Sequence, residues 1–310
     1  MLHVRVVSPP GVTERLIEVL AADAGVRNLV VLPGAARLPG GDAVQFDVMT
    51  GSANPVFKHL RGLHLDAGHF ISIENVDAII SDRVNSAERR TAGHRELAPV
   101  WEMVRAKIRA DAIYPPSFFI LLAIAGLIGA VGILTNSQIL IVGAMVVGPE
   151  YGAIIAVALG ITERDRTAIG PGIAALFFGF IAAIVVTLAF GLAIRWTGRA
   201  PTAFLLGVRP VSNLIDSPNL FSFVVAVLAG IVGVVSLTEA RANALIGVFI
   251  SVTTIPAAAD VGVSTAFTAW SEAWGSLLQL LLNVVVLIAV GAGGLVVQRA
   301  VWRERSSRPR

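Results

Sequence analysis

The 310-residue sequence has no cysteine and little charge. The absence of cysteine excludes disulfides, thiolate chemistry and cysteine-ligated metal sites. Charged residues make up only 15% of the chain, against about a quarter in an average soluble protein, and the mean hydropathy is +0.77. All five histidines precede residue 95, so no Ser-His pair is available to the apolar second half. We therefore do not expect an enzyme.

Long uncharged runs begin after residue 116, whereas residues 1–116 are rich in charge of both signs. A membrane-spanning helix needs about 20 mostly apolar residues, so we expect an all-α membrane domain over 117–298. The apolar runs predict six spans, at 117–135, 138–160, 168–194, 219–237, 243–260 and 275–298. We expect no cleavable signal peptide, because the first residues lack a long apolar stretch.

Residues 1–80 read as a soluble domain. Alternating "LHVRVV" predicts a strand, "GVTERLIEVLAADAG" a helix, and two strands, a helix and a last strand follow. The order β-α-β-β-α-β is typical of an α+β ferredoxin-like fold. The domain's histidines lack the spacing of a ligand set, so we expect no metal site; they are His3, His59, His64 and His69.

Residues 81–116 are expected to form a polar linker and an amphipathic helix. Leu97, Trp101, Val104 and Ile108 fall on one stripe, with basic residues elsewhere. A basic amphipathic helix before a first span is typical of one that lies on the membrane surface. The alternative is packing against the soluble domain.

Loop charges predict the orientation. Arg164, Arg166, Arg241 and the basic tail 299–310 fall on one side of the six-span scheme, which the positive-inside rule makes cytoplasmic. The loop 195–218 is an exception, with arginines on the other side. We expect both termini in the cytoplasm and the chain in the cytoplasmic (inner) membrane of a bacterium or archaeon.

The membrane half contains a weak internal repeat. The segment from Gly126 to Pro149 resembles the segment from Gly230 to Pro256, and both copies end at an intramembrane proline in the second of three spans. Because three is odd, the second copy must be inverted, which is a recurring plan of transporters with broken helices.

Each proline is expected to end one half-helix and begin another, since proline lacks a backbone donor but fits the first turn. Glu150 and Asp260 follow these breaks, and in a transporter we expect them to bind a cation or carry a proton. Half-helix N-termini instead favour an anion, so the sequence does not determine the charge of the substrate. Structural alternatives are a helix-end role for Glu150 and simple kinks at the prolines, and glycines such as Gly143 are expected to allow close packing. The candidate transport or binding residues are Asn136, Ser137, Gly148, Pro149, Glu150, Thr253, Thr254, Pro256, Asp260 and Asn283.

Residues 136–161, "NSQILIVGAMVVGPEYGAIIAVALGI", resemble the signature of the domain-of-unknown-function family 389, hydrophobic membrane proteins of bacteria and archaea. The matching positions are Asn136, Ser137, Gly143, Ala144, Met145 and Pro149. Glu150 departs from the family pattern, in which Met or Leu often follows the proline. "TTIPAAADVGV" and Asn283 fit a second family element. The resemblance covers most of the chain and implies no established activity.

These observations favour a transporter or channel for a small solute or ion, with a regulatory or oligomerising cytoplasmic domain. The alternative is a membrane-anchored small-ligand sensor or scaffold. We expect the lipid bilayer and other copies of the chain as partners, because glycine-rich spans favour helix association. We expect no cofactor and no nucleic acid.

Overall fold

The computed structural model describes residues 1–63, 70–76, 100–209, 212, 215–217, 219–238 and 254–307. It forms two compact units, which are described separately. One comprises Met1–Arg105 with Val301–Arg310, and the other comprises Ala106–Ala300.

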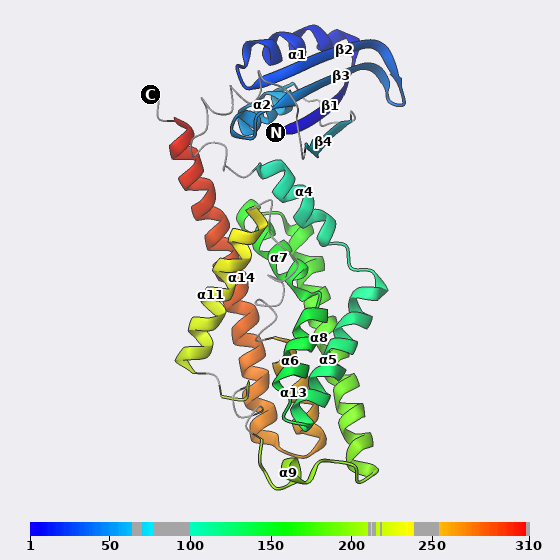
Figure 1. Ribbon diagram of the computed structural model, residues 1–310, viewed down its shortest axis with the longest axis vertical. Coiled ribbons are helices and arrows are strands. Elements are labelled where there is room, and N and C mark those ends of the chain that lie inside the picture. Colours follow the sequence, from blue (N-terminus) through cyan, green and yellow to red (C-terminus); the bar gives the residue numbers. More distant parts are fainter. Residues whose placement is uncertain are drawn as a thin grey trace. The chain divides into compact units, whose positions relative to one another are not determined.

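The N-terminal unit contains a four-stranded sheet and two helices (Figure 1). The strand order is β2-β3-β1-β4, and every neighbouring pair is antiparallel. The elements follow the predicted order: β1 (Leu2–Ser8), α1 (Pro10–Ala22), β2 (Val26–Arg37), β3 (Gly40–Val48), α2 (Thr50–Gly62) and β4 (Ile71–Asn75).

Alternation along the strands builds the core of this unit. Val4 and Val6 of β1 pair with Phe46 and Val44 of β3, and all four side chains are buried. Apolar residues of α1 and α2, such as Leu16 and Leu60, belong to the same cluster, so both helices cover one face of the sheet. Val100, just before α4 (Trp101–Asp111), completes it.

Helix α4 carries the expected amphipathic stripe, but protein covers that stripe. Val104 and Ile108 are buried, and the Trp101 backbone nitrogen donates to Asn54 Oδ1 at 3.2 Å. The position of this helix at the membrane surface stays a prediction. The packing alternative fits, because the stripe buries its apolar area against other side chains.

The second unit is helical. Among the described residues, four helices are long and apolar enough to cross a membrane, namely α5, α8, α11 and α14, and the bent pair α6 and α7 gives a fifth if it is one span. The chain is therefore a multi-pass membrane protein by the length and composition of its helices. The helices are α5 (Pro116–Leu134), α6 (Gln138–Val147), α7 (Glu150–Glu163), α8 (Arg166–Trp196), α9 (Thr202–Leu205), α11 (Leu220–Thr238), α13 (Ile255–Ala266) and α14 (Trp270–Ser307). Most of the expected span 243–260 lies outside the described residues.

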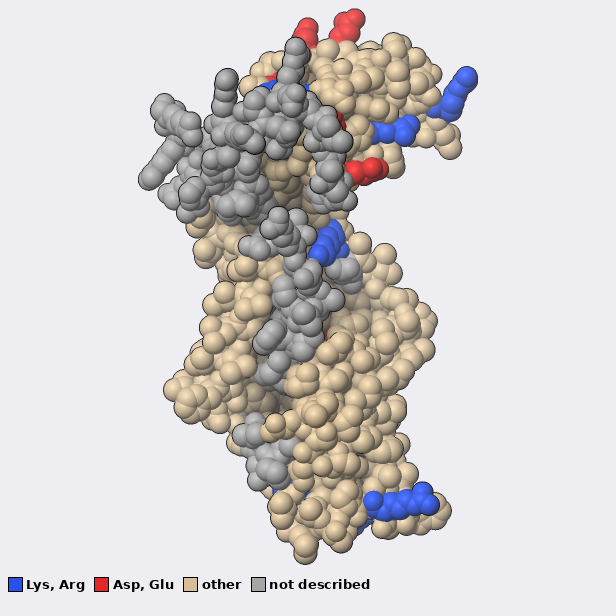
Figure 2. Space-filling view, viewed as in Figure 1, with Lys and Arg blue, Asp and Glu red and all other residues tan. Residues whose placement is uncertain are grey.

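The outer surface of the helical unit suits lipid. Large apolar side chains such as Phe177 and Val285 are exposed, and the face in Figure 2 is almost free of charge between its ends. Three exposed tryptophans, Trp196, Trp270 and Trp274, lie at the end of α8 and the start of α14. Tryptophan is enriched where a helix leaves the hydrocarbon, so these residues mark one membrane boundary.

Glycines set the closest helix contacts. A Cβ atom at Gly262 of α13 would lie 2.8 Å from both the Ile184 oxygen and the Leu188 nitrogen of α8. Gly191 of α8 likewise faces Ala266 of α13. Gly143 of α6 meets nothing within 4 Å among the described residues, so that part of the chain shows no close packing at this glycine. Small residues let backbones approach where lipid supplies no hydrophobic drive between helices.

Gly262→Ala should destabilise the helical unit, because the new methyl group meets the α8 backbone, which cannot rotate away. We expect a loss of about 1–3 kcal/mol, as in other overpacked cores, read as a lower thermal unfolding midpoint in detergent. Gly143→Ala is the matched control and should leave the midpoint unchanged or slightly raised, since alanine favours helix. Equal effects of the two substitutions would contradict this packing.

Candidate functional site

The predicted break at Pro149 is confirmed. Helix α6 ends at Val147 and α7 begins at Glu150, with a bend of 53° between them. Gly148 is extended, with φ −66° and ψ 123°, because the residue before a proline is disfavoured in the helical region. Pro149 is the N-cap of α7 and supplies no backbone donor to the preceding turn. Two adjacent residues therefore end one half-helix and begin the next.

Glu150, the first residue of α7, is fully buried. Its Oε1 accepts a hydrogen bond from the Thr254 hydroxyl at 2.8 Å. Thr254 is the N-cap of α13 and is also fully buried, and Pro256 lies in the first turn of that helix. This contact joins residues 104 positions apart, and it brings the starts of two half-helices together.

From this meeting point, α7 and α13 run toward opposite ends of α8. Gly160, near the end of α7, packs against Ile169 at the start of α8. Gly191, near the end of α8, packs against Ala266 at the end of α13. The positive ends of both half-helices therefore point at the same interior position, where the Glu150 carboxylate lies.

This arrangement explains how a carboxylate is tolerated there. An acid at the centre of a membrane helix costs about 3 kcal/mol. A helix N-terminus offsets about 0.3–2 kcal/mol of such a cost, and a hydrogen bond to a charged group contributes about 1.5–3 kcal/mol. The interactions are of the same order as the penalty, so Glu150 can be accommodated in a buried position.

Asp260 forms a second buried acidic site within α13. Its Oδ1 accepts from the Ser212 hydroxyl at 2.7 Å and its Oδ2 from the Ser276 hydroxyl at 2.6 Å. All three residues are buried. Asp260 and Ser276 are each eight residues from Thr268, the left-handed turn residue between α13 and α14, as expected for an antiparallel hairpin.

Helix α14 presents a polar stripe. Glu272, Ser276, Gln279 and Asn283 recur at spacings of three and four, which places them on one helix face. Gln279 Nε2 donates to Asn283 Oδ1 at 3.2 Å, and both residues are buried. Asn283 lies seven residues, about 10 Å, beyond Ser276. In the antiparallel hairpin this brings Asn283 to the depth of Thr254.

Asn136 and Ser137 are not part of this centre. Asn136 has φ 52° in the turn between α5 and α6, a conformation that asparagine tolerates well, and its Nδ2 donates to the Val208 carbonyl at 3.1 Å. Ser137 is the N-cap of α6 and accepts from the Leu140 nitrogen at 3.4 Å. Both residues shape a helix turn, which is a local structural role. Thr253 lies outside the described residues.

Sequence reasoning missed Ser212 and Ser276. The spacing of polar residues along the otherwise apolar α14 is a signal by which Ser276 could have been identified from the sequence. Ser212 carries no such signal, because its 48-residue separation from Asp260 is bridged only in the fold.

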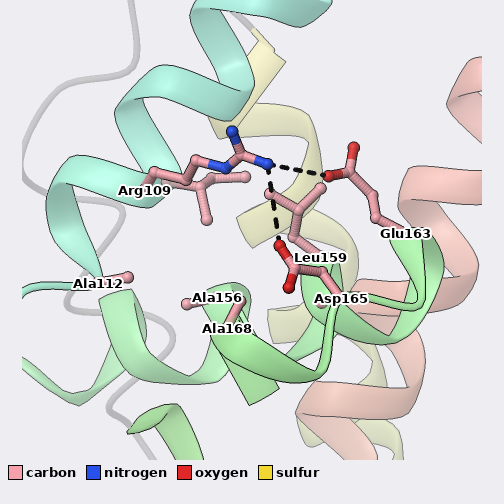
Figure 3. Close-up of a pocket in the computed structure, with 9 residues that line it drawn as sticks. Arg109, Ala112, Ala156, Leu159, Glu163, Asp165 and Ala168 are labelled. Atoms are coloured by element: carbon pink, nitrogen blue, oxygen red, sulfur yellow. Dashed lines mark ion pairs between the residues drawn. The ribbon is translucent and has the colours of Figure 1, made fainter. Parts of the chain in front are cut away.

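A charged cluster lies where α7 turns into α8, away from the buried carboxylates (Figure 3). Arg109 lies 3.8 Å from Glu163 and 3.9 Å from Asp165, and Arg299 pairs with Glu163 at 2.6 Å. Asp165 caps α8, and hydrogen bonds from the Thr167 hydroxyl and backbone lower the pKa of its carboxyl. A cavity of about 20 Å³ beside these residues holds roughly one water. The charges are balanced, so the cluster fastens helix ends.

Thr254→Val should test the contact between the half-helices, because valine keeps the shape of threonine but lacks its hydroxyl. Removing the donor from buried Glu150 should lower the free energy of unfolding by about 1–3 kcal/mol. Thr265→Val is the control, since the Thr265 hydroxyl bonds the Val261 carbonyl of its own helix. Chemical denaturation in detergent measures the free energy of unfolding of the two variants. Equal losses would show that the Thr254–Glu150 hydrogen bond stabilises the protein no more than a hydrogen bond within one helix.

Comparison with known proteins confirms the resemblance carried by the sequence. The model of a domain of unknown function, DUF389, matches residues 145–289, a range that contains both buried carboxylates and the starts of α7 and α13. No curated protein and no solved structure matches the chain. The match of residues 145–289 is consistent with an assignment of this membrane protein to the DUF389 family.

Proposed function

We propose that the chain is a transporter or channel for a small solute or ion, whose pathway passes the meeting point of α7 and α13. The observation that carries this proposal is the hydrogen bond between Glu150 and Thr254, at the starts of two half-helices. Helix starts and a carboxylate at membrane depth are tolerated where protein covers them or where they line a polar path. Transporters with discontinuous helices place their substrate and ion sites at such points.

The proposal includes six spans arranged as two inverted repeats of three. Two turns support it, because α7 and α13 end in the same way. Arg164 and Thr268 both have left-handed φ values, of 56° and 60°. The next residue donates to a carbonyl five positions earlier in each case, Asp165 to Gly160 and Ala269 to Ser264, both at 2.8 Å. A long apolar helix, α8 or α14, follows each turn.

We further propose that the end of the helical unit holding Arg109 and Arg299 is cytoplasmic, in a bacterial or archaeal inner membrane. The arginines of the opposite end do not argue strongly against this orientation, because protein groups engage two of them. Arg195 donates to the Ala266 carbonyl at 2.8 Å, and Arg209 pairs with Glu272 at 2.5 Å. These two arginines stabilise the ends of helices by contacts within the protein, so their position does not have to report the orientation of the chain in the membrane.

For the N-terminal unit we propose a ferredoxin-like fold with a regulatory or oligomerising role. Its element order and its sheet order β2-β3-β1-β4 support the fold. A homo-oligomer is in keeping with the exposed strand β2, whose Val30 and Leu32 side chains are open, since an edge strand is able to pair with another chain.

The second candidate function is a membrane-anchored sensor or scaffold that transports nothing. The full burial of Glu150 and Thr254 favours it, because a purely structural contact needs no access. A carrier in an occluded state has the same enclosure. The burial of these residues therefore fits both functions, and a measurement of flux distinguishes them.

Glu150→Gln should change transport, because glutamine keeps the size and hydrogen-bonding capacity of glutamate but removes the charge at the proposed crossing. Purified protein in liposomes is assayed for Na⁺, K⁺, H⁺ and Cl⁻ flux with ion-sensitive dyes. We expect a flux in the unchanged protein that falls at least about tenfold in Glu150→Gln, which corresponds to about 1.4 kcal/mol in the barrier.

Glu163→Gln, at the other end of the same helix, is the matched control and should keep most of the flux. Absence of flux of any tested ion, together with normal assembly of the protein, would favour the sensor or scaffold. Identical flux and pH dependence in Glu150→Gln would remove this carboxylate from the mechanism.

A further inference from the structure

The Asp260 carboxylate has a more complete polar environment than its sequence context predicts. Three separate parts of the chain build it: α13 supplies Asp260, α14 supplies Ser276, and Ser212 comes from the segment between α9 and α11. The Asp260, Ser212 and Ser276 side chains are at most 1% exposed. Each carboxylate oxygen accepts one hydroxyl hydrogen bond, so the carboxylate is held from both sides.

No basic side chain balances this carboxylate. Within the described ranges, no Lys, Arg or His forms an ion pair with Asp260, and two arginines at this end of the helices have other partners. Arg209 pairs with Glu272, and Arg195 bonds the Ala266 carbonyl. A buried carboxylate without a compensating charge is costly in a membrane interior, so a proton or a bound cation would stabilise Asp260 beyond its two hydrogen bonds.

Two more buried oxygens flank this carboxylate. Ser264 Oγ and Gln279 Oε1 have no hydrogen-bond partner among the residues described. Ser264 lies four residues after Asp260, which is one turn along the same face of α13, and Gln279 lies three residues after Ser276 on α14. An unpartnered buried oxygen is uncommon, and here two of them lie on the helix faces that hold the carboxylate.

The donor set selects the class of cation. The set contains only oxygens, which suit hard ions such as Na⁺, Mg²⁺ and Ca²⁺. It has one carboxylate, and the described chain has no group of three His, Cys, Asp or Glu residues that could hold a metal. One negative charge and several neutral oxygens balance a single positive charge. Serine hydroxyls rotate between donating and accepting, so the oxygens that now donate to Asp260 are able to face a cation.

We propose that Asp260, Ser212 and Ser276, with Ser264 and Gln279 beside them, form a binding site for a monovalent metal cation, Na⁺. The site lies on α13, six residues beyond the contact between Thr254 and Glu150. A cation here neutralises Asp260 and links α13 to α14. This binding is a property of the folded chain and does not require that the chain transports anything.

The test measures binding of ²²Na⁺ to the purified full-length protein in detergent, so that it is independent of flux. We expect saturable binding that unlabelled Na⁺ displaces and choline does not. Asp260→Asn should reduce affinity by at least about tenfold, the scale of losing one charged ligand interaction. Ser276→Ala should weaken binding severalfold while removing only one neutral oxygen.

Two matched variants serve as controls. Ser236→Ala removes another buried hydroxyl, which bonds the Gly233 carbonyl of its own helix, and Glu163→Gln removes a carboxylate that pairs with Arg299 outside the site. Both should retain Na⁺ affinity. Size-exclusion profiles verify the folding of each variant.

Three results would overturn the proposal. One is the absence of saturable Na⁺ binding in the unchanged protein, which would leave Asp260 neutralised by a proton alone. Another is unchanged affinity in Asp260→Asn. The third is unchanged affinity in Ser276→Ala, and it decides the matter where Asp260→Asn does not fold. None of these results bears on the flux assay, so the site and the proposed transport function fail separately.

Discussion

The hydrogen bond between Thr254 and Glu150 is the contact on which the arrangement of the helical unit depends. Pro149 ends α6, and a free helix start inside an apolar unit leaves backbone donors without partners. The carboxylate at the start of α7 lies at the positive ends of both helices, and the Thr254 hydroxyl at the start of α13 donates to it. The broken backbone and the buried charge therefore stabilise each other, and neither is easily understood alone.

Close packing by small residues makes this contact possible. Gly148 stands beside Ile255, Gly129 beside Ala259, and Gly262 beside the α8 backbone. At these glycines the neighbouring helices approach α13 so closely that a larger side chain would not fit without a shift. In lipid, apolar area drives helices together only weakly, and close approach supplies the attraction through dispersion. All residues of α13 except Thr265 are buried, whereas α8 and α14 each carry exposed apolar side chains.

The sequence predicted the features that arise locally. The break at Pro149 and the start of α13 at Thr254 follow from the chemistry of proline within a few residues. The partners of Asp260 do not, because Ser212 and Ser276 reach it only once three segments have packed. Asn136 and Ser137 were assigned to the centre from residue type, yet asparagine and serine are also the residues that a tight helix turn selects. In this chain Ser137 caps α6, and Asn136 forms the turn and donates to the Val208 carbonyl.

The partners of the two buried carboxylates share one chemical property. Thr254 faces Glu150, and Ser212 and Ser276 face Asp260, so the hydrogen bonds described for both acids come from hydroxyl groups. An arginine in these places would fix the charge of each acid permanently and clamp the helices. A hydroxyl stabilises the ionised carboxylate by donating, and it accepts when the carboxyl takes a proton or when a cation arrives. A membrane protein that only needed rigid helices would gain more from apolar residues of the same volume. Hydroxyl partners leave the charge state of both acids exchangeable, which is the property that a transport or ion-binding role requires.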